Sequence, residues 1–464
     1  MSEQVKDFSK HIPLVENNAT SAQLDDVIAA PMEKYPPIRW WICFAVALSL
    51  LGFGAYSLIR TVYFGIGEWG NNNPVFWAFD IVNFVFWIGI GHAGTLISAV
   101  LFLFRQWWRN SIARAAEAMT VFAVICAMIF PIIHTGRPWL AHYLLPYPSE
   151  RNLWTNFTSP LEWDVFAVTT YGTVSFVFWY VGLIPDFGVM RDRTKITTFM
   201  SGVRKYVYTV LSWGWINSNR HWQHYERTYL ILAGFATPLV FSVHTIVSFD
   251  FATSVIPGWH TTIFPPYFVA GAVFSGFAMV VSVMTIVRWA YHLEHIITIN
   301  TLEKVNKILM ATGLMVGYAY GMEFFIAWYG QNPNESFVFY NRAFGPNSLG
   351  YWTMVTCNVI TPQIFWFRKA RRSILVMSIV AIFVNIGMWY ERYTIIVSSL
   401  SRDYLQSSWD RYEFSIIDIG LLLGSFGLFF TLVLLFTRFL PVVAMSEIKA
   451  VAENNQPTHH GDDH

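Results

Sequence analysis

The chain has 464 residues, of which 55% are hydrophobic, 18% aromatic and only 13% charged, and its formal net charge at pH 7 is +1. This composition is typical of a polytopic membrane protein. A net charge so close to zero also argues against a nucleic acid as a partner. Membrane lipid is therefore the first expected neighbour of the chain.

Ten apolar segments are each long enough to cross roughly 30 Å of hydrocarbon as a helix. Lipid cannot satisfy the backbone polar groups of an open strand edge, so an all-α fold is expected. The chain is predicted to consist of a polar segment at 1–38, a ten-helix transmembrane domain at 39–441 and a polar tail at 442–464. In chain order, the predicted spans are 39–63, 74–104, 111–134, 160–184, 228–254, 264–291, 305–330, 347–368, 372–396 and 414–441.

The positive residues predict the orientation of these helices. The loops and flanking segments on the side of both termini hold 23 of the 30 Lys and Arg residues, and the opposite side holds seven. Positive residues favour the cytoplasmic side, so both termini are predicted to be cytoplasmic. The polar segment 1–38 has no apolar core and no small-residue cleavage site, so the first helix is expected to direct insertion.

Cysteine and histidine usage limits the cofactors that the chain can be expected to carry. Cys43, Cys126 and Cys357 are isolated in apolar runs, a pattern that predicts no iron-sulfur cluster and no zinc site. A b-type haem needs two facing histidines, and the candidates near the middle of the membrane are His92 and His244. Two lone histidines are more typical of buried hydrogen-bonded side chains, and His92 is also a candidate for a proton path.

Four ionisable residues, His134, Asp164, Asp250 and Arg392, lie about one turn from the ends of four predicted helices. The predicted topology places all four on the extracytoplasmic side. A charge at mid-bilayer costs roughly 2.5 to 3.5 kcal/mol, so such residues usually face protein, water or a ligand. Taken singly, Arg392 could be an interfacial anchor, Asp250 could pair with Arg392, and His134 could cap a helix end. Asp80, Glu323 and Asp418 lie toward the same side and are weaker candidates.

Together, an imidazole, two carboxylates and a fixed cation suit the headgroup of a quinol. Oxidation of a quinol removes two electrons and two protons, which calls for groups that hydrogen-bond the ring oxygens and accept protons. The hypothesis is that His134 and Asp164 are catalytic, holding one ring oxygen and relaying its proton outward, while Asp250 and Arg392 complete the quinol-binding pocket. A proton path would use His92, Glu323 and Asp80. Aromatic neighbours could stack on the ring; they are Trp139, Trp163, Phe249 and Phe251.

The order and placement of four short strings resemble the NrfD-like family of membrane subunits of polysulfide reductase type and, within it, the NrfD-like subunits of bacterial alternative complex III. The resemblance extends over residues 39–441. It is carried by Gly91-His92-Ala93-Gly94, His134-Thr135-Gly136-Arg137-Pro138-Trp139, Glu162-Trp163-Asp164 and Phe249-Asp250-Phe251. It implies two four-helix bundles, formed by helices 2 to 5 and 6 to 9 and flanked by helices 1 and 10.

The resemblance also implies a function, namely a menaquinol to cytochrome c or oxidase oxidoreductase that needs partner subunits for turnover. Menaquinol would bind near the periplasmic face of the bacterial inner membrane, at His134, Asp164, Asp250 and Arg392, and proton translocation could accompany its oxidation. The electrons would pass to a periplasmic iron-sulfur subunit docked on the outer loops, which include residues 135–159. Multihaem and monohaem c-type cytochrome subunits, a second NrfD-like subunit and a haem-copper oxidase are the other implied partners.

Two alternatives stay open at the level of the sequence. One is a homologous subunit of the same complex that is structural or proton-conducting and lacks part of the outer cluster. The other is a secondary transporter, favoured by ten helices with intramembrane charges. Transporter sites usually lie at the midplane on broken helices, and this chain has few acids there.

Overall fold

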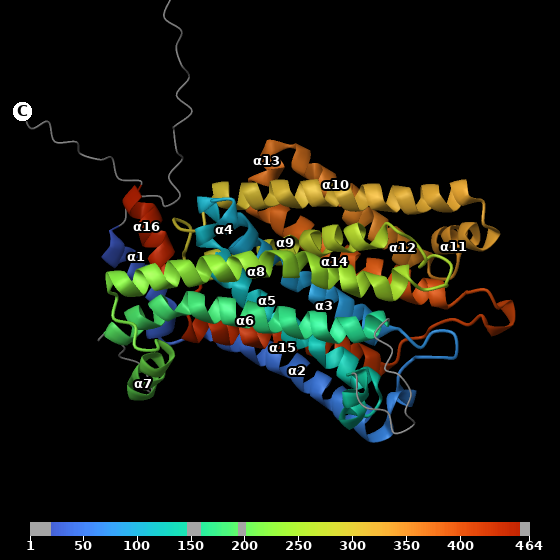
Figure 1. Ribbon diagram of the computed structural model, residues 1–464, viewed down its shortest axis with the longest axis horizontal. Helices are drawn as coiled ribbons and strands as arrows, with labels where there is room; N and C mark the ends of the chain where they lie inside the picture. Colours follow the sequence, from blue (N-terminus) through green and yellow to red (C-terminus); the bar gives the residue numbers. More distant parts are fainter. Residues whose placement is uncertain (1–19, 146–158, 194–200, 455–464) are drawn as a thin grey trace, which may run out of the picture.

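The computed structural model describes residues 20–145, 159–193 and 201–454, and these residues form α-helices joined by loops, without a strand among them (Figure 1). Three of the predicted segments are described only in part. Residues 1–19 of the polar segment 1–38, residues 146–158 of the outer loop 135–159 and residues 455–464 of the polar tail 442–464 lie outside the described residues. The α-helices are α1 (Ser21–Glu33), α2 (Ile38–Phe64), α3 (Phe79–Thr95), α4 (Leu101–Leu103), α5 (Ala113–His134), α6 (Pro160–Asp192), α7 (Ser201–Leu211), α8 (Asn219–Ala252), α9 (Phe264–Ala290), α10 (Ile299–Gly330), α11 (Pro333–Phe344), α12 (Ser348–Val355), α13 (Arg368–Arg371), α14 (Ile374–Tyr393), α15 (Ile416–Phe439) and α16 (Met445–Asn454).

Within the described ranges, nine helices are long and apolar enough to cross a membrane. The predicted eighth span, 347–368, is helical but is not one continuous α-helix. It consists of α12, a π-helical turn at Thr356–Ile360 and a 3-10 segment at Thr361–Trp366. Pro362 has no backbone N–H to donate, so one hydrogen bond of the helical ladder is missing in this segment. Ten uninterrupted transmembrane helices are therefore not found in the described part of the chain.

Helix α3 lies at the centre of the molecule and contacts α5, α8, α9, α14 and α15. Almost all of its residues are buried. Small residues allow this close packing: a Cβ at Gly94 would lie 2.0 Å from the carbonyl oxygen of Ala116 on α5, and one at Gly276 on α9 would lie 2.6 Å from the Cβ of Ala93. Close approach at small residues is the usual way in which membrane helices pack.

Helices α2 and α15, the predicted first and tenth spans, pack against each other. A Cβ at Gly54 would lie 2.4 Å from the Cα of Gly424, so the two backbones touch at this crossing. Helix α15 also contacts α3 and α5, whereas α2 exposes most of its apolar side chains. Helix α2 is thus attached to the rest of the molecule mainly through α15.

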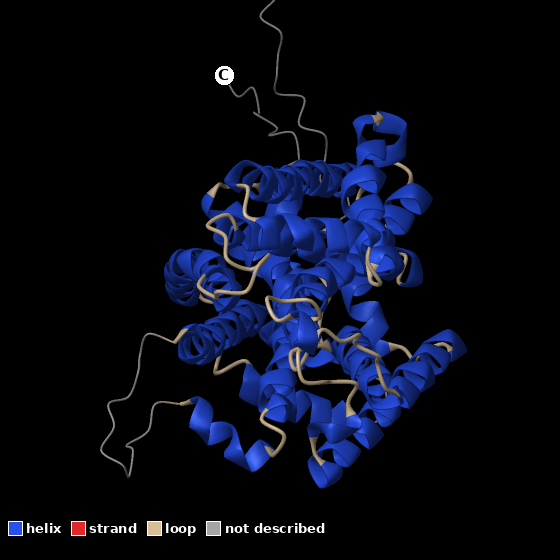
Figure 2. Cartoon of the chain, turned by 90° about the vertical axis from the view of Figure 1, so that its right-hand side faces the viewer, coloured by secondary structure: helices blue, strands red, loops and turns tan. Residues whose placement is uncertain are grey.

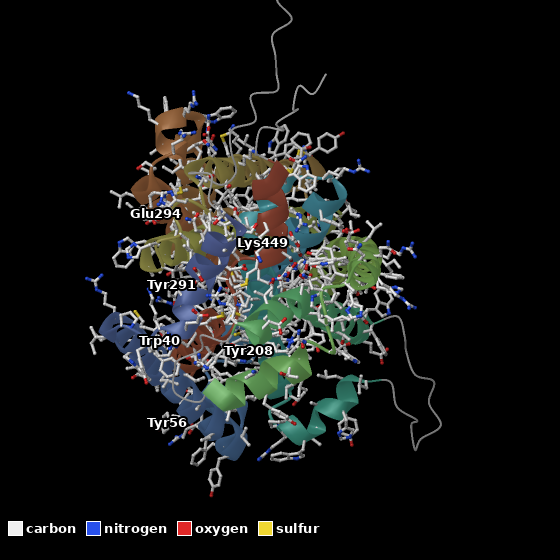
Figure 3. All side chains as sticks on the ribbon, turned by 90° about the vertical axis from the view of Figure 1, so that its left-hand side faces the viewer. Trp40, Tyr56, Tyr208, Tyr291, Glu294 and Lys449 are labelled. Atoms are coloured by element: carbon white, nitrogen blue, oxygen red, sulfur yellow. The ribbon has the colours of Figure 1, made fainter. Side chains whose placement is uncertain are left out.

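The long helices run side by side along the long axis, so the molecule has two ends (Figure 1). We call them the α11 end and the α16 end after the short helices that lie there. Figure 2 views the α11 end, where the helices are joined by several loops. Figure 3 views the α16 end, with Tyr208, Tyr291 and Lys449 among its labelled residues. Lys449 pairs there with Asp25 at 2.6 Å, which ties α16 to α1.

Candidate functional site at the α11 end

The helix directions bring the four predicted residues to the same end of the molecule. Helix α5 ends at His134, and α6 begins at Pro160, so that Asp164 lies in its first turns. Asp250 is two residues from the end of α8, and Arg392 is the penultimate residue of α14. The residues nevertheless belong to three separate clusters of contacts.

The first cluster is the pair of carboxyl groups of Asp164 and Asp250, which lie within hydrogen-bonding reach of each other. Asp164 is only 7% exposed. The Oδ1 atom of each residue is buried and has no hydrogen-bond partner among the described residues. Two carboxyl groups can share a hydrogen bond only when one of them is protonated, so the pair is suited to accept and release a proton.

The second cluster is the pair of His134 and Asp80. The Nδ1 atom of His134 bonds to Oδ2 of Asp80, which is buried at the start of α3. The backbone N–H of Ala78 donates to the other carboxylate oxygen of Asp80 at 3.2 Å. With Nδ1 bonded to a carboxylate, Nε2 is the nitrogen of His134 that remains for a ligand. Asp80, predicted only as a weaker candidate, thus orients the imidazole.

The third cluster surrounds Arg392, which is 2% exposed. Its Nη1 atom lies 2.5 Å from Oε1 of Glu391, and its guanidinium group lies over the ring of Phe268, 4.5 Å from the ring centroid. Glu391 also accepts a hydrogen bond from the hydroxyl of Tyr320, and the side-chain amide of Asn358 donates to that hydroxyl at 2.8 Å. The alternative in which Arg392 pairs with Asp250 is wrong, because each residue has a different partner.

Aromatic rings join the second and third clusters. The ring centroid of Trp77 lies 6.3 Å from that of His134 and 6.0 Å from that of Phe251. The ring centroid of Phe251 lies 5.5 Å from that of Phe268, and the guanidinium group of Arg392 lies over the ring of Phe268. His134 and Arg392 are therefore linked through rings rather than through hydrogen bonds. Trp77 lies on the segment before α3 and was not expected at the site.

The other predicted aromatic residues lie at different places. Trp163 and Phe249 face each other from α6 and α8 beside the carboxyl pair, with ring centroids 6.5 Å apart. Trp139 stacks with the guanidinium of Arg137 at 5.6 Å, in the 3-10 segment Pro138–Leu144. This segment begins the loop predicted to dock a partner, and residues 146–158 of that loop lie outside the described ranges.

Of the three residues proposed for a proton path, Asp80 belongs to the second cluster, whereas His92 and Glu323 lie elsewhere. His92 is fully buried in α3, with its ring centroid 4.6 Å from that of His244 and its Nδ1 atom 2.8 Å from the carbonyl oxygen of Ile88. The rings of His92 and His244 are in direct contact, whereas two axial ligands of a haem lie on its opposite faces and are therefore farther apart. Glu323 is buried on α10, 3.8 Å from Arg342 of α11. Neither His92 nor Glu323 contacts the pairs of the first two clusters.

Two further observations concern acids and metals. Asp418, another weaker candidate, accepts hydrogen bonds from the backbone N–H of Gly70 and from the hydroxyl of Tyr412, both at 2.9 Å, and caps α15. Asp418 therefore has a structural role in the start of α15.

Among the described residues, no group of three or more His, Cys, Asp or Glu side chains is arranged to hold a metal ion.

Comparison with known proteins identifies the family. The family model described as polysulphide reductase, NrfD, matches residues 67–402, which is most of the chain. The chain belongs to the NrfD family. NrfD proteins are integral membrane subunits of oxidoreductase complexes. The matched region begins in the segment before α3 and ends in the loop that follows α14, so α2 and α15 lie outside it.

One curated relative is a protein of Halobacterium salinarum that is described as a membrane subunit of a dimethyl sulfoxide reductase. It is 24% identical over 247 residues, which are 53% of this chain and 51% of the relative. The chain thus spans about half the length of the curated relative that it matches. The family match and this relative agree on a membrane subunit of a redox complex.

Proposed function

We propose that this NrfD protein is the quinol-oxidising membrane subunit of a bacterial respiratory complex of the alternative complex III type. The observation that carries the proposal is the contact between the carboxyl groups of Asp164 and Asp250. Each has a buried oxygen without a partner, at the helix end where His134 also lies. Buried acids are costly in a membrane and generally mark a functional site.

Menaquinol is the proposed substrate. One ring hydroxyl donates to Nε2 of His134, and Asp80 stabilises the positive charge that the imidazole gains when it takes the proton. The Asp164 and Asp250 pair takes the second proton. In this sequence of steps the quinol loses two protons to the protein, which releases them outward, and two electrons to a partner subunit.

Arg392 is proposed to complete the pocket rather than to take part in proton transfer. Glu391 holds its guanidinium group against Phe268, and this ring reaches Trp77 through Phe251. The rings offer apolar faces on which a quinone ring can stack. The guanidinium group of Arg392, paired with Glu391, thus lies behind the aromatic wall of the site.

The proposed architecture in the membrane is ten crossings, with the segment from α12 to Trp366 as the eighth. Two four-helix bundles are proposed, one of α3, α5, α6 and α8 and the other of α9, α10, α12 and α14. The contacts of α6 with α5 and α8, and of α14 with α9 and α12, support this grouping. The α11 end is proposed to be periplasmic and both termini cytoplasmic.

Electrons are proposed to leave at the α11 end to a periplasmic iron-sulfur subunit. The c-type cytochrome subunits, a second NrfD-like subunit and a haem-copper oxidase would complete the assembly. The description of the halobacterial relative favours a second candidate acceptor, the iron-sulfur subunit of a reductase of dimethyl sulfoxide type. In both cases the quinol site of this chain is the same.

Of the two alternatives raised by the sequence, a paralogue without quinol chemistry remains the rival within the family. It is expected to lack part of the cluster, and this chain has all four residues. Proton translocation through His92 and Glu323 stays a proposal. A secondary transporter is not proposed, because the family consists of subunits of oxidoreductase complexes.

The test is quinol oxidation by the purified complex. Asp164→Asn and His134→Ala should each abolish turnover while the yield of the complex stays normal. Asp192→Asn is the matched control, because Asp192 is an exposed acid at the other end of the same helix, paired with Arg191. Normal turnover in both site variants would contradict the proposal.

A further inference from the structure

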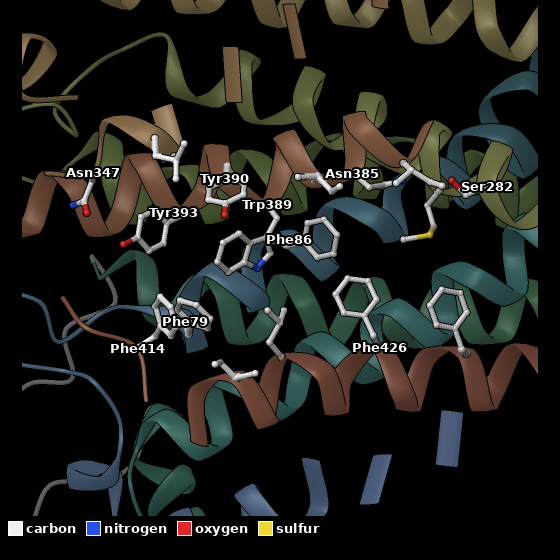
Figure 4. A pocket seen from close by; sticks show the side chains of 18 of the residues that line it. Phe79, Phe86, Ser282, Asn347, Asn385, Trp389, Tyr390, Tyr393, Phe414 and Phe426 are labelled. Atoms are coloured by element: carbon white, nitrogen blue, oxygen red, sulfur yellow. The ribbon is translucent and has the colours of Figure 1, made fainter. Parts of the chain in front are cut away.

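A separate cavity of about 670 Å³ lies between α14 and α15 and reaches the α11 end (Figure 4). Its volume is in the range of ligand sites in proteins. The rings of Phe79 and Trp389, with centroids 5.0 Å apart, form the wall between this cavity and the interior of the molecule. None of the four residues of the proposed quinol site lines it.

The only charged side chain of the described lining lies at one end of the cavity, and the rest of the lining is mainly apolar apart from Ser282 and Asn385. Asn347 and Tyr393 lie at the α11 end, whereas Phe86 and Phe426 lie farther along the helices (Figure 4). Ile382 and Tyr393 are eleven positions apart on α14, which corresponds to about 16 Å at 1.5 Å per residue. That length is about half of the roughly 30 Å hydrocarbon core, so the cavity spans one leaflet.

The groups at the polar end are hydrogen-bond donors. Arg411 is the one charged residue among the described residues that line the cavity, and its guanidinium group makes no hydrogen bond or ion pair with another described residue. The buried Nδ2 atom of Asn347 has no partner either. By contrast, the indole N–H of Trp389 already donates to Asn83 at 2.8 Å. A buried amide donor without a partner, beside the exposed cation of Arg411, suits a ligand with anionic oxygen atoms.

We propose that this cavity is a binding site for an anionic phospholipid. Its phosphate group is held by Arg411 and Asn347 at the α11 end, and one acyl chain fills the apolar part beside Ile386, Leu422 and Phe426. A quinol fits this end less well, because its hydroxyl groups need acceptors and are neutral. An apolar transmembrane helix of a partner protein would leave the buried amide of Asn347 unsatisfied.

The first experiment measures lipid retention. The complex is purified in mild detergent, exchanged against phosphatidylglycerol or phosphatidylcholine, and examined by native mass spectrometry. The wild type should retain one phosphatidylglycerol per chain in preference to phosphatidylcholine, and Arg411→Gln should lower its retention about fivefold. Arg402→Gln is the control, because Arg402 stacks on Trp409 in the same loop and does not line the cavity.

A second pair of variants tests the acyl-chain part. Leu422→Trp fills the cavity and should lower retention, whereas Leu423→Trp, at the next position of α15, should leave retention unchanged. Equal retention by the Arg411→Gln variant and the wild type would overturn the proposal. So would a retained mass that matches a quinone, or a partner helix that crosslinks to a cysteine placed at Ile386. These results do not depend on quinol turnover, so the lipid site and the quinol site can fail separately.

Discussion

The Arg392–Glu391 ion pair gives a sharp prediction, because the chain contains another Arg–Glu pair with the same shortest N–O distance in a different environment. In both pairs an Arg nitrogen lies 2.5 Å from a Glu oxygen. Arg392 and Glu391 are 2% and 0% exposed at their side chains, whereas Arg60 and Glu68 are 37% and 23% exposed. The substitutions Glu391→Gln and Glu68→Gln remove the same charge from the two pairs.

Glu391→Gln leaves the guanidinium of Arg392 buried without a counter-charge. Breaking a buried pair in this way costs about 3 to 5 kcal/mol, whereas an exposed pair contributes little. Gln can still accept one hydrogen bond from Tyr320, so the loss comes mainly from the charge. The Glu391→Gln variant should therefore lower the free energy of unfolding by about 3 kcal/mol or more, and Glu68→Gln should change it far less.

The assay is unfolding of both variants and the wild type in the same mixed micelles, by titration with denaturing detergent. The yield of the complex gives an independent check. If the two variants were destabilised equally, the reasoning from burial would be refuted. A Glu391→Asp variant should recover part of the loss, since it restores the charge at a longer distance.

Two further predictions concern the site and the fold. Asp80→Asn should lower quinol turnover about 10- to 100-fold and shift its pH profile, because the imidazole of His134 loses the carboxylate that orients it; an unchanged profile at normal rate would remove Asp80 from the mechanism. Gly54→Val should destabilise the protein by about 1 to 3 kcal/mol, because its Cβ overlaps Gly424. Gly52→Val, on the same helix with open space around it, is the control in the same unfolding assay, and equal stability of the two variants would contradict the close α2 and α15 crossing.

The helical class and most of the spans could be predicted from the sequence, because about 20 consecutive apolar residues are a strong signal that depends on local composition. The eighth span shows the limit of that signal. Hydropathy does not distinguish an α-helix from the π-helical and 3-10 turns that follow Val355, and Pro362 was the residue that could have indicated the break. The orientation and the crossing of ten segments stay predictions.

The site was predictable in part for a similar reason. Consecutive membrane helices run in opposite directions, so the number of preceding spans gives the end at which each of the four residues lies. Their common location therefore follows from counting the spans. Their partners depend on which helices are neighbours and on how each helix is rotated, and the sequence does not contain this information in a readable form. Asp80 was named as a weaker candidate, but its pairing with His134 was not predicted, and Glu391 was missed although it is adjacent to Arg392.

The central claim is that quinol binds at the α11 end between His134 and the Asp164 and Asp250 pair. Photoaffinity labelling tests it most directly: the complex is irradiated with a photoreactive menaquinone analogue, and the labelled peptides are identified by mass spectrometry. We predict labels around Trp77 and in the first turns of α6, which excess menaquinone should compete away. Competed labels confined to the cavity between α14 and α15, or to the α16 end, would contradict the account.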